Sequence, residues 1–220
     1  MAKPGVPSKA GGGASAASES TRRALIEAAI DVLKTHGFHG ASARRIAERA
    51  GCNQALVFYH FGSVANLLLA ALDAVSADRL ERYSAAVAEA SSLVALTDVA
   101  AGIFEEDLDS GYAKVLVELI AGGSSAPGLG PEVAARIETW TGFAQSSIEE
   151  SVDPVMLAAT APASEVAYGI VAMYLGLELL SHLDGDRDKA RALFGRARQL
   201  VALASAFGIL PDAEKGKGRE

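Results

Sequence analysis

Residues 41–61 read ASARRIAERAGCNQALVFYHF, which is the pattern of two short helices joined by a tight turn. Ser42 is suited to cap the first helix, because its hydroxyl can accept from the free N–H groups of the first turn. Gly51 stands where a helix often ends in the left-handed conformation that glycine tolerates. Asn53 is suited to cap the second helix in the same way as Ser42. The stretch therefore predicts a helix-turn-helix.

The second predicted helix has a polar face with almost no acidic residues. Gln54 can pair with an adenine edge in the major groove, and Tyr59 and His60 can donate to phosphates. Arg44 and Arg45 of the preceding helix can reach the groove or the phosphate backbone. These side chains indicate double-stranded DNA as a partner.

A longer run, TRRALIEAAIDVLKTHGFHGASARRIAERAGCNQALVFYHFGSVANLLLAAL, resembles the N-terminal domain of the TetR family of transcriptional regulators. The resemblance includes the HGF turn, the IAERAG helix and the YHF end. It implies an all-α protein of about nine helices, with a three-helix DNA-binding domain followed by a helical domain for ligand binding and dimerisation. It also implies a homodimeric repressor that a small hydrophobic ligand releases from a near-palindromic operator.

The resemblance assigns roles to residues of the predicted helix-turn-helix. The residues placed at base edges are Arg44, Gln54, Ala55 and Leu56. The residues placed at phosphates are Tyr59 and His60, and Arg45 is expected to touch the phosphate backbone.

Three positions depart from the family's usual residues. Phe58 lacks a tyrosine hydroxyl, Leu56 replaces a common threonine, and Val64 replaces a Lys or Arg that contacts phosphate. These changes remove up to three polar contacts with DNA. The alternative function is therefore a helical protein-interaction module with weakened or lost DNA binding.

Charge is unevenly distributed along the 220 residues, although the net charge of −7 alone would disfavour DNA. Residues 1–65 hold eight Lys or Arg and four Asp or Glu, whereas residues 66–220 hold twelve and twenty-three. Residues 1–65 thus have a net charge of +4 and residues 66–220 a net charge of −11. This distribution is typical of a DNA-binding domain joined to an acidic domain.

Other classes of protein have little support in the sequence. It has no phosphate-binding glycine loop, G-x-S-x-G, H-E-x-x-H or cysteine pair, so we expect neither an enzyme nor a cofactor. His36 and His39 lack a ligand cluster at metal-binding spacing. His182 is near Asp184 and Asp186, which could suggest a metal site, but the pattern is more simply a helix end and a turn. The best apolar run, 166–177, is shorter than a membrane span of roughly 18 residues, and no signal segment precedes it. The single cysteine, Cys52, favours the reducing cytoplasm and leaves a redox-sensing role open.

Composition and breaks divide the chain into four segments. We expect a disordered arm at 1–20, a DNA-binding domain at 21–65, a regulatory and dimerisation domain at 66–210 and a flexible tail at 211–220. The first helix should start at Ser20 or Thr21 and end at Gly37. Its apolar stripe comprises Leu25, Ala28, Ala29, Val32 and Leu33. Ser63 caps a long helix, and further helices are expected near 93–109, 111–121, 131–151, 164–183 and 188–207.

The last two predicted helices carry more apolar residues than one buried face requires. They could be ordinary core, but the resemblance implies a four-helix dimer interface. The residues we place there are Tyr174, Leu177, Leu193, Ala197, Leu200, Val201 and Ala204.

Aromatic and methionine residues are spread over several helices of the acidic region and could line a cavity for an apolar effector, although each such residue is more often core. The candidate ligand-binding residues are Phe104, Tyr112, Trp140, Phe143, Met156, Tyr168 and Met173. Between residues 93 and 181 only Lys114 and Arg136 are basic, which disfavours a multiply anionic effector.

Overall fold

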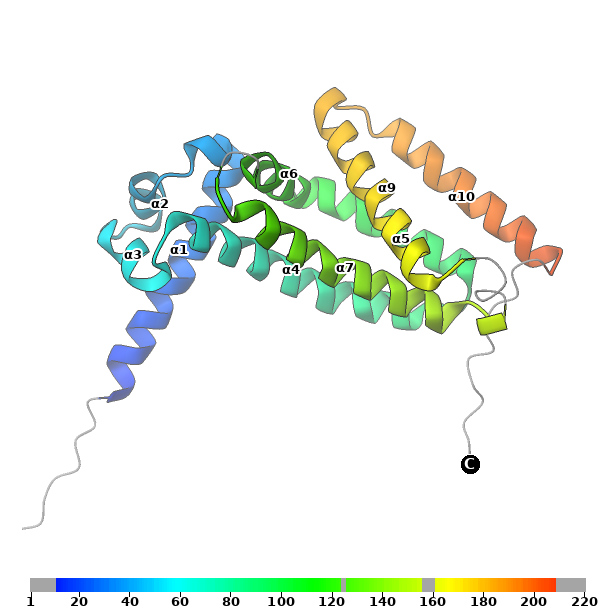
Figure 1. The fold of residues 1–220 in the computed structure, drawn as a ribbon, viewed down its shortest axis with the longest axis horizontal. Helices are drawn as coiled ribbons and strands as arrows, with labels where there is room; N and C mark the ends of the chain where they lie inside the picture. Colours follow the sequence, from blue (N-terminus) through cyan, green and yellow to red (C-terminus); the bar gives the residue numbers. More distant parts are fainter. Residues whose placement is uncertain (1–10, 124–125, 156–160, 209–220) are drawn as a thin grey trace, which may run out of the picture. The chain divides into compact units, whose positions relative to one another are not determined.

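The computed structural model describes residues 11–123, 126–155 and 161–208, and the predicted all-α fold is confirmed for them. The helices drawn in Figure 1 run as follows: α1 Gly11–Gly40, α2 Ala43–Ala50, α3 Ala55–Phe61, α4 Val64–Glu89, α5 Leu93–Ser110, α6 Tyr112–Gly123, α7 Leu129–Ser151, α9 Ala163–Asp184 and α10 Asp188–Ala206.

The chain divides into two compact units, residues 1–74 and 75–220, which we call the head and the body. The division falls within α4, later than the boundary at residue 65 that the sequence suggested. One continuous helix therefore contributes its first half to the head and its second half to the body.

The head is built around the predicted apolar stripe of α1, whose five members are all buried. Ile46 of α2, Val57 of α3, and Leu67 and Leu72 of α4 are buried in the same unit. Helices α2 and α3 are too short to be stable alone, so burial of their apolar side chains in this shared core holds them in place.

The start of α1 differs from the expectation. Residues 11–20 are helical, whereas a disordered arm was expected to reach residue 20. The side chains of residues 15–20 are exposed, so packing does not explain the helix. Alanine has the highest helix propensity, and the Thr21 hydroxyl donates to the Ala17 carbonyl one turn earlier (3.0 Å). Residues 1–10 and the predicted tail at 211–220 lie outside the described residues.

Gly37 interrupts α1 with φ 69° and ψ −178°, at the position where the sequence predicted a helix end. The next glycine, Gly40, has a different constraint. A Cβ there would lie 2.6 Å from the His36 Cβ and 3.0 Å from an Arg45 nitrogen, so the junction between α1 and α2 has no room for a side chain.

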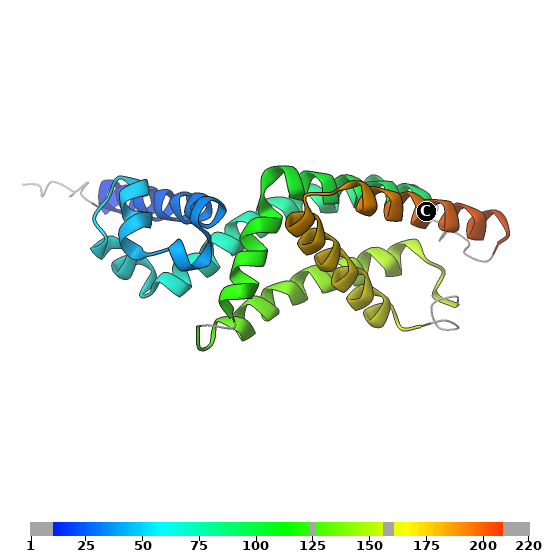
Figure 2. The same cartoon turned by 90° about the horizontal axis from the view of Figure 1, so that it is seen from above.

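In the body, α9 packs against α7, α10 lies beside α5, and α6 contacts both α5 and α7 (Figure 2). The buried core includes Phe104, Val115, Leu119 and Ala167. By length and composition, α9 alone could span a membrane, and the bent pair α3 and α4 would qualify only as one joint span. Core helices also meet this criterion, so the evidence for a membrane is weak among the described residues.

Candidate nucleic-acid interface and buried polar cluster

The turn between α2 and α3 is fixed by local hydrogen bonds. Ser42 Oγ accepts from the Arg45 N–H (3.3 Å), which confirms the predicted cap of α2. Gly51 is left-handed, with φ 68°, as predicted. Asn53 Oδ1 accepts from the Ala55 N–H (2.8 Å), so Asn53 caps α3 although Gln54 is the residue that immediately precedes the helix.

One face of α3 is open to solvent. Gln54, Ala55 and Tyr59 are exposed, and Tyr59 retains 78% of its accessible surface. Leu56 and His60 are half-buried, while Val57 is fully buried on the opposite side. The helix is therefore held by one face and presents amide and phenol groups on the other.

The arginines of α2 have different surroundings. Arg44 is exposed and pairs with Glu48 (3.2 Å), one turn along the same helix. Arg45 is half-buried, and its Nη1 donates to the Gly40 carbonyl (2.8 Å). Arg49 pairs with Asp31 of α1. Arg44 is thus free to change partners at low cost, whereas Arg45 also holds the junction between α1 and α2.

The positions that depart from the family pattern lie at this surface or beside it. Phe58 keeps 51% of its surface exposed, and Val64 is half-buried at the start of α4. Ser63 caps that helix as predicted, since its Oγ accepts from the Asn66 N–H (3.1 Å).

Cys52 lies between the two helices of the turn and is half-buried. Its backbone N–H donates to the Ala47 carbonyl (3.0 Å), and burial raises the pKa of its thiol. No group of three or more His, Cys, Asp or Glu side chains is arranged for a metal ion within the described ranges.

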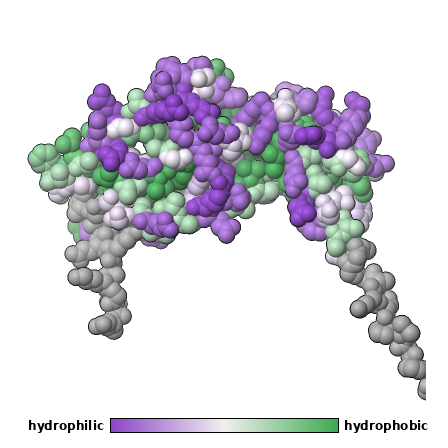
Figure 3. Space-filling model, turned by 180° about the vertical axis from the view of Figure 1, so that it is seen from behind, coloured by the Kyte–Doolittle hydropathy of each residue, from purple (hydrophilic) through white to green (hydrophobic). Residues whose placement is uncertain are grey.

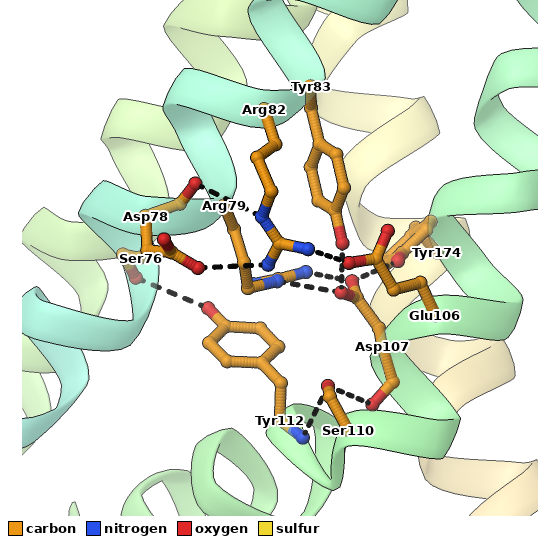
Figure 4. Close-up of polar contacts among 10 residues, drawn as sticks. All are labelled: Ser76, Asp78, Arg79, Arg82, Tyr83, Glu106, Asp107, Ser110, Tyr112 and Tyr174. Carbon is orange, nitrogen blue, oxygen red and sulfur yellow. Dashed lines mark hydrogen bonds and ion pairs between the residues drawn. The ribbon is translucent and has the colours of Figure 1, made fainter. Parts of the chain in front are cut away.

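The body contains a buried polar cluster that the sequence reading missed (Figure 4). Arg79 of α4 and Asp107 of α5 form an ion pair through two hydrogen bonds, one of them 2.6 Å long between Nε and Oδ1. The hydroxyls of Tyr83 and Tyr174 both donate to the same carboxylate, the former at 2.7 Å. Asp107 has no exposed surface, and it joins α4, α5 and α9.

Aromatic rings surround the Arg79 guanidinium. Its central carbon lies 3.2 Å from the ring centre of Tyr112 and 4.7 Å from that of Trp140. The Tyr112 hydroxyl is also within hydrogen-bonding distance of Ser76 (3.4 Å). Cations over π faces are stabilised most where water is excluded, so the rings and Asp107 together compensate the buried charge of Arg79.

Glu178 of α9 is the least satisfied member of the cluster. Only 1% of its surface is exposed, and neither carboxylate oxygen has a hydrogen-bond partner among the described residues. Burial raises the pKa of its carboxyl to about 7, against the opposite effects of the Arg79 charge and the nearby Tyr174 hydroxyl. Burial likewise raises the pKa of Tyr112 and Tyr174. Arg79 Nη1 is also buried without a partner.

The predicted ligand-binding residues fall into three groups. Phe104 and Tyr112 are buried, Trp140 and Phe143 are half-buried, and these four lie at or near the polar cluster through ring contacts. Tyr168 and Met173 are 69% and 44% exposed on α9, so the structure does not bring them to the cluster. Met156 lies outside the described residues.

The predicted interface residues differ in how much of their surface is exposed. Leu193 and Leu200 are exposed, whereas Leu177, Ala197, Val201 and Ala204 are half-buried. Tyr174 points into the body, where its hydroxyl contacts Asp107 and its ring meets Phe104 edge-on, so we withdraw it from the interface. Periodicity alone could not separate its two possible faces. The exposed apolar residues of α9 and α10 include Tyr168, Ile170, Met173, Leu179, Leu180, Leu183, Leu193, Leu200, Leu203 and Phe207.

A shallow groove of about 380 Å³ runs between α5 and α10. Its charged side chains are paired, with Arg191 bound to Glu105 and Arg198 bound to Asp98. The groove therefore differs from the Glu178 cluster, where polar atoms lack partners.

A signal for the missed cluster was present in the sequence. Glu178 interrupts the apolar run of α9, and Asp107 lies on the same helix face as Phe104. A charged residue on an apolar face is buried only with partners, but nothing in the sequence identifies a partner 28 residues away, as Arg79 is from Asp107.

Comparison with known proteins supports the assignment of the head. Residues 25–71 match the family model described as bacterial regulatory proteins, tetR family. The HTH-type transcriptional repressor AcnR of Corynebacterium efficiens is 29% identical over 167 residues, which cover 76% of this chain and 79% of that protein. AcnR of Corynebacterium glutamicum is 32% identical over 101 residues, covering 46% and 49% respectively.

The whole fold also has solved counterparts. A TetR transcriptional regulator from Legionella pneumophila superposes with a TM-score of 0.66 at 17% identity, covering 82% of this chain and 97% of that one. At that identity the likeness concerns the fold alone, but it extends through both units. Residues 25–71 thus belong to the tetR family of bacterial regulatory proteins by the family match, and the chain has the fold of solved TetR-family regulators.

Proposed function

We propose that this chain is a transcriptional repressor that binds an operator as a homodimer and is released by a small hydrophobic ligand that is neutral or weakly charged. The observation that carries the DNA-binding part is the open face of α3, where Gln54, Ala55 and Tyr59 are exposed on a helix held by the buried Val57. The two relatives named as transcriptional repressors support repression as the direction of regulation.

On this surface, the groups divide by the chemistry that they can offer to DNA. Gln54 and Arg44 are exposed donors suited to base edges, and Ala55 and Leu56 can meet thymine methyl groups. Tyr59 and His60 are suited to phosphates. Arg45 can contribute to the positive potential, although its bond to Gly40 gives it a structural role as well.

The dimer is supported by the outer faces of α9 and α10. Leu180, Leu183, Leu200, Leu203 and Phe207 retain between 55% and 77% of their surface in the single chain. Hydrophobic areas among hydrophilic ones are visible on the face drawn in Figure 3. Large apolar side chains exposed in this number are typical of association sites, and a two-fold dimer would present two identical heads to a near-palindrome.

Release by an effector would act through α4. This helix supplies the buried Leu67 and Leu72 to the head, and Arg79 and Tyr83 to the polar cluster of the body. A ligand that binds the cluster better in one arrangement of α4 would shift the population towards it. Operator and ligand would then weaken each other's binding by the same factor. We place this activity in the cytoplasm, where family members act.

DNA binding is tested by selecting duplexes from a random pool and measuring the affinity of the enriched sequence against salt. We expect a near-palindrome and a steep fall of affinity with salt. Tyr59→Phe should weaken binding to specific and random duplexes alike, because it removes one phosphate donor. Tyr168→Phe, at an exposed position of α9, is the matched control and should change nothing.

The alternative, a protein-interaction module, makes a different prediction. Phe58, Leu56 and Val64 would then have removed enough contacts that no duplex is retained even at low salt. That result would refute the repressor while leaving the fold and the dimer unaffected.

The dimer is tested separately by light scattering. Leu200→Asp places a charge in the proposed interface, where its desolvation is costly, and should yield folded monomers. Ile120→Asp alters a residue of α6 with 43% exposure outside the proposed interface and should remain dimeric. A wild-type monomer at micromolar concentration would refute the interface.

A further inference from the structure

The carboxylate of Glu178 is an unusual group, because it is 99% buried and both its oxygens lack partners. An ionised carboxylate removed from water without hydrogen bonds is strongly destabilising. A group in this position needs donors that the described residues do not supply. While Glu178 is ionised, these donors must come from water or from a bound molecule.

The Tyr174 hydroxyl lies close enough to Glu178 to lower the pKa of that carboxyl, but its single proton is donated to Asp107, as are the other neighbouring donors. The single hydroxyl protons of Tyr83 and Tyr174 go to Asp107, as do Nε and Nη2 of Arg79. The view in Figure 4 shows these groups converging on that one carboxylate. Redirecting any of them to Glu178 would leave Asp107 unsatisfied instead.

The balance of charge indicates the kind of donor that would fit. Arg79 is matched by Asp107, so an ionised Glu178 leaves the cluster with one uncompensated negative charge. A monocation with N–H donors would supply both the charge and the hydrogen bonds. An anion would add a second uncompensated charge in the same low-dielectric region.

The surroundings of the cluster are suited to the apolar part of such a molecule. Phe104 meets Tyr174 edge-on at 5.6 Å, and Trp140 meets Phe143 edge-on at 6.1 Å. Aromatic faces favour both apolar groups and cations. This combination of rings and a free carboxylate distinguishes the cluster from the fully paired groove between α5 and α10.

We propose that Glu178 is the recognition residue of an effector site for an organic amine, whose ammonium group binds the two free carboxylate oxygens and whose apolar body contacts Phe104, Tyr174 and Trp140. The inference rests on the proposed ligand release and gives the ligand a chemical class. Arg79 Nη1 offers one further donor, to an oxygen on the same molecule.

Trp140 is the only tryptophan of the chain and lies at the cluster, so its fluorescence can report binding. The probes are 4-phenylbutylamine, its neutral counterpart 4-phenylbutan-1-ol and the anion 4-phenylbutyrate, titrated at pH 8, where Glu178 is mostly ionised. We expect the amine to bind at least about tenfold more tightly than the alcohol, and the anion least.

Glu178→Gln keeps the shape of the side chain and removes its charge. It should weaken amine binding by about tenfold or more and leave alcohol binding unchanged. Glu165→Gln makes the same change at an exposed position of α9 and should leave all three affinities unchanged. Circular dichroism of both variants checks that they fold.

Three outcomes would overturn the proposal: equal affinity for amine and alcohol, an amine affinity unchanged by Glu178→Gln, or no binding of any probe up to about 1 mM. The last result would mean that water alone occupies the cluster. Operator binding by the same preparations is measured without probe, so a failure of DNA binding is recognised separately. Weakened operator binding on addition of the amine would link the site to release.

Discussion

The head and the body use polar side chains in opposite ways. In the head, Gln54, Tyr59 and Arg44 are exposed, and residues a few positions away fix the helices that carry them. In the body, Arg79 and Asp107 are buried and come from different helices. The head thus presents polar groups to solvent, where a partner can bind them. In the interior of the body, by contrast, every unpaired polar group lowers the stability of the fold.

Asp107→Ala should have the largest effect, on the stability of the body. It leaves the Arg79 charge buried without its carboxylate and should cost roughly 3–5 kcal/mol of unfolding free energy. Urea unfolding measures the loss. Asp98→Ala breaks an ion pair with Arg198 that is about half exposed, and should cost little. Equal effects of the two substitutions would contradict the comparison.

Glu178→Gln should change the dependence of stability on pH. The folded-state pKa of Glu178 is raised to about 7 from 4.5, so the wild type loses stability as pH rises through this window. The difference between the two pKa values corresponds to about 3 kcal/mol of unfolding free energy. The variant should therefore be more stable than the wild type at pH 8 and equally stable near pH 4.

The groups that act electrostatically on Glu178 belong to several helices: Arg79 of α4, Tyr112 of α6 and Tyr174 of α9. Of these, the Arg79 charge and the Tyr174 hydroxyl oppose the raised pKa of Glu178, and burial outweighs both. Unfolding by urea across pH 4–8 tests this balance. Parallel curves for the wild type and the variant would show that Glu178 titrates normally.

Gln54→Ala should affect DNA affinity and leave stability unchanged. Loss of a bidentate base contact should cost roughly 1–3 kcal/mol at the selected operator and relax one base position. Competition binding against single-base variants of the operator measures both. Gln145→Ala on α7 is the control, because that side chain bonds to Glu149 in the body (2.8 Å).

Asn53→Ala should have the smallest effect. It removes the side-chain acceptor for the Ala55 N–H and should destabilise the head by about 1 kcal/mol. Asn53→Asp keeps an acceptor there and should restore stability, as thermal unfolding can show. If Asn53→Asp does not restore the thermal stability of the wild type, the Asn53 amide group has a further role in the turn.

The helix-turn-helix could be predicted from the sequence because its determinants are local. Ser42, Gly51 and Ser63 each act on residues within a turn of themselves, so their type and position suffice. The predicted start of α1 was wrong, because residues 11–20 are helical although the side chains of residues 15–20 are exposed. Local reasoning therefore succeeds where a residue's partner is near in sequence.

The buried cluster could not be predicted because its contacts cross the body. Asp107 meets Tyr174 over 67 residues, and only the packing of α4, α5 and α9 brings the groups together. Tyr174 had been placed on the outer face of α9, and Met173, its neighbour, in a cavity. One residue along a helix turns a side chain by about 100°, so an error of one position exchanges the inner and outer faces.

Cys52 makes the opening of the head measurable by chemistry. Its thiol is half-buried and its pKa is raised, so alkylation near neutral pH should be slow while the turn is closed. It directly precedes Asn53, the cap of α3, so local unfolding of that cap should also expose the thiol. The alkylation rate would thus measure how often the turn unfolds locally. Because the chain has no other cysteine, no engineered label is needed. A duplex that holds α3 in place should slow the reaction.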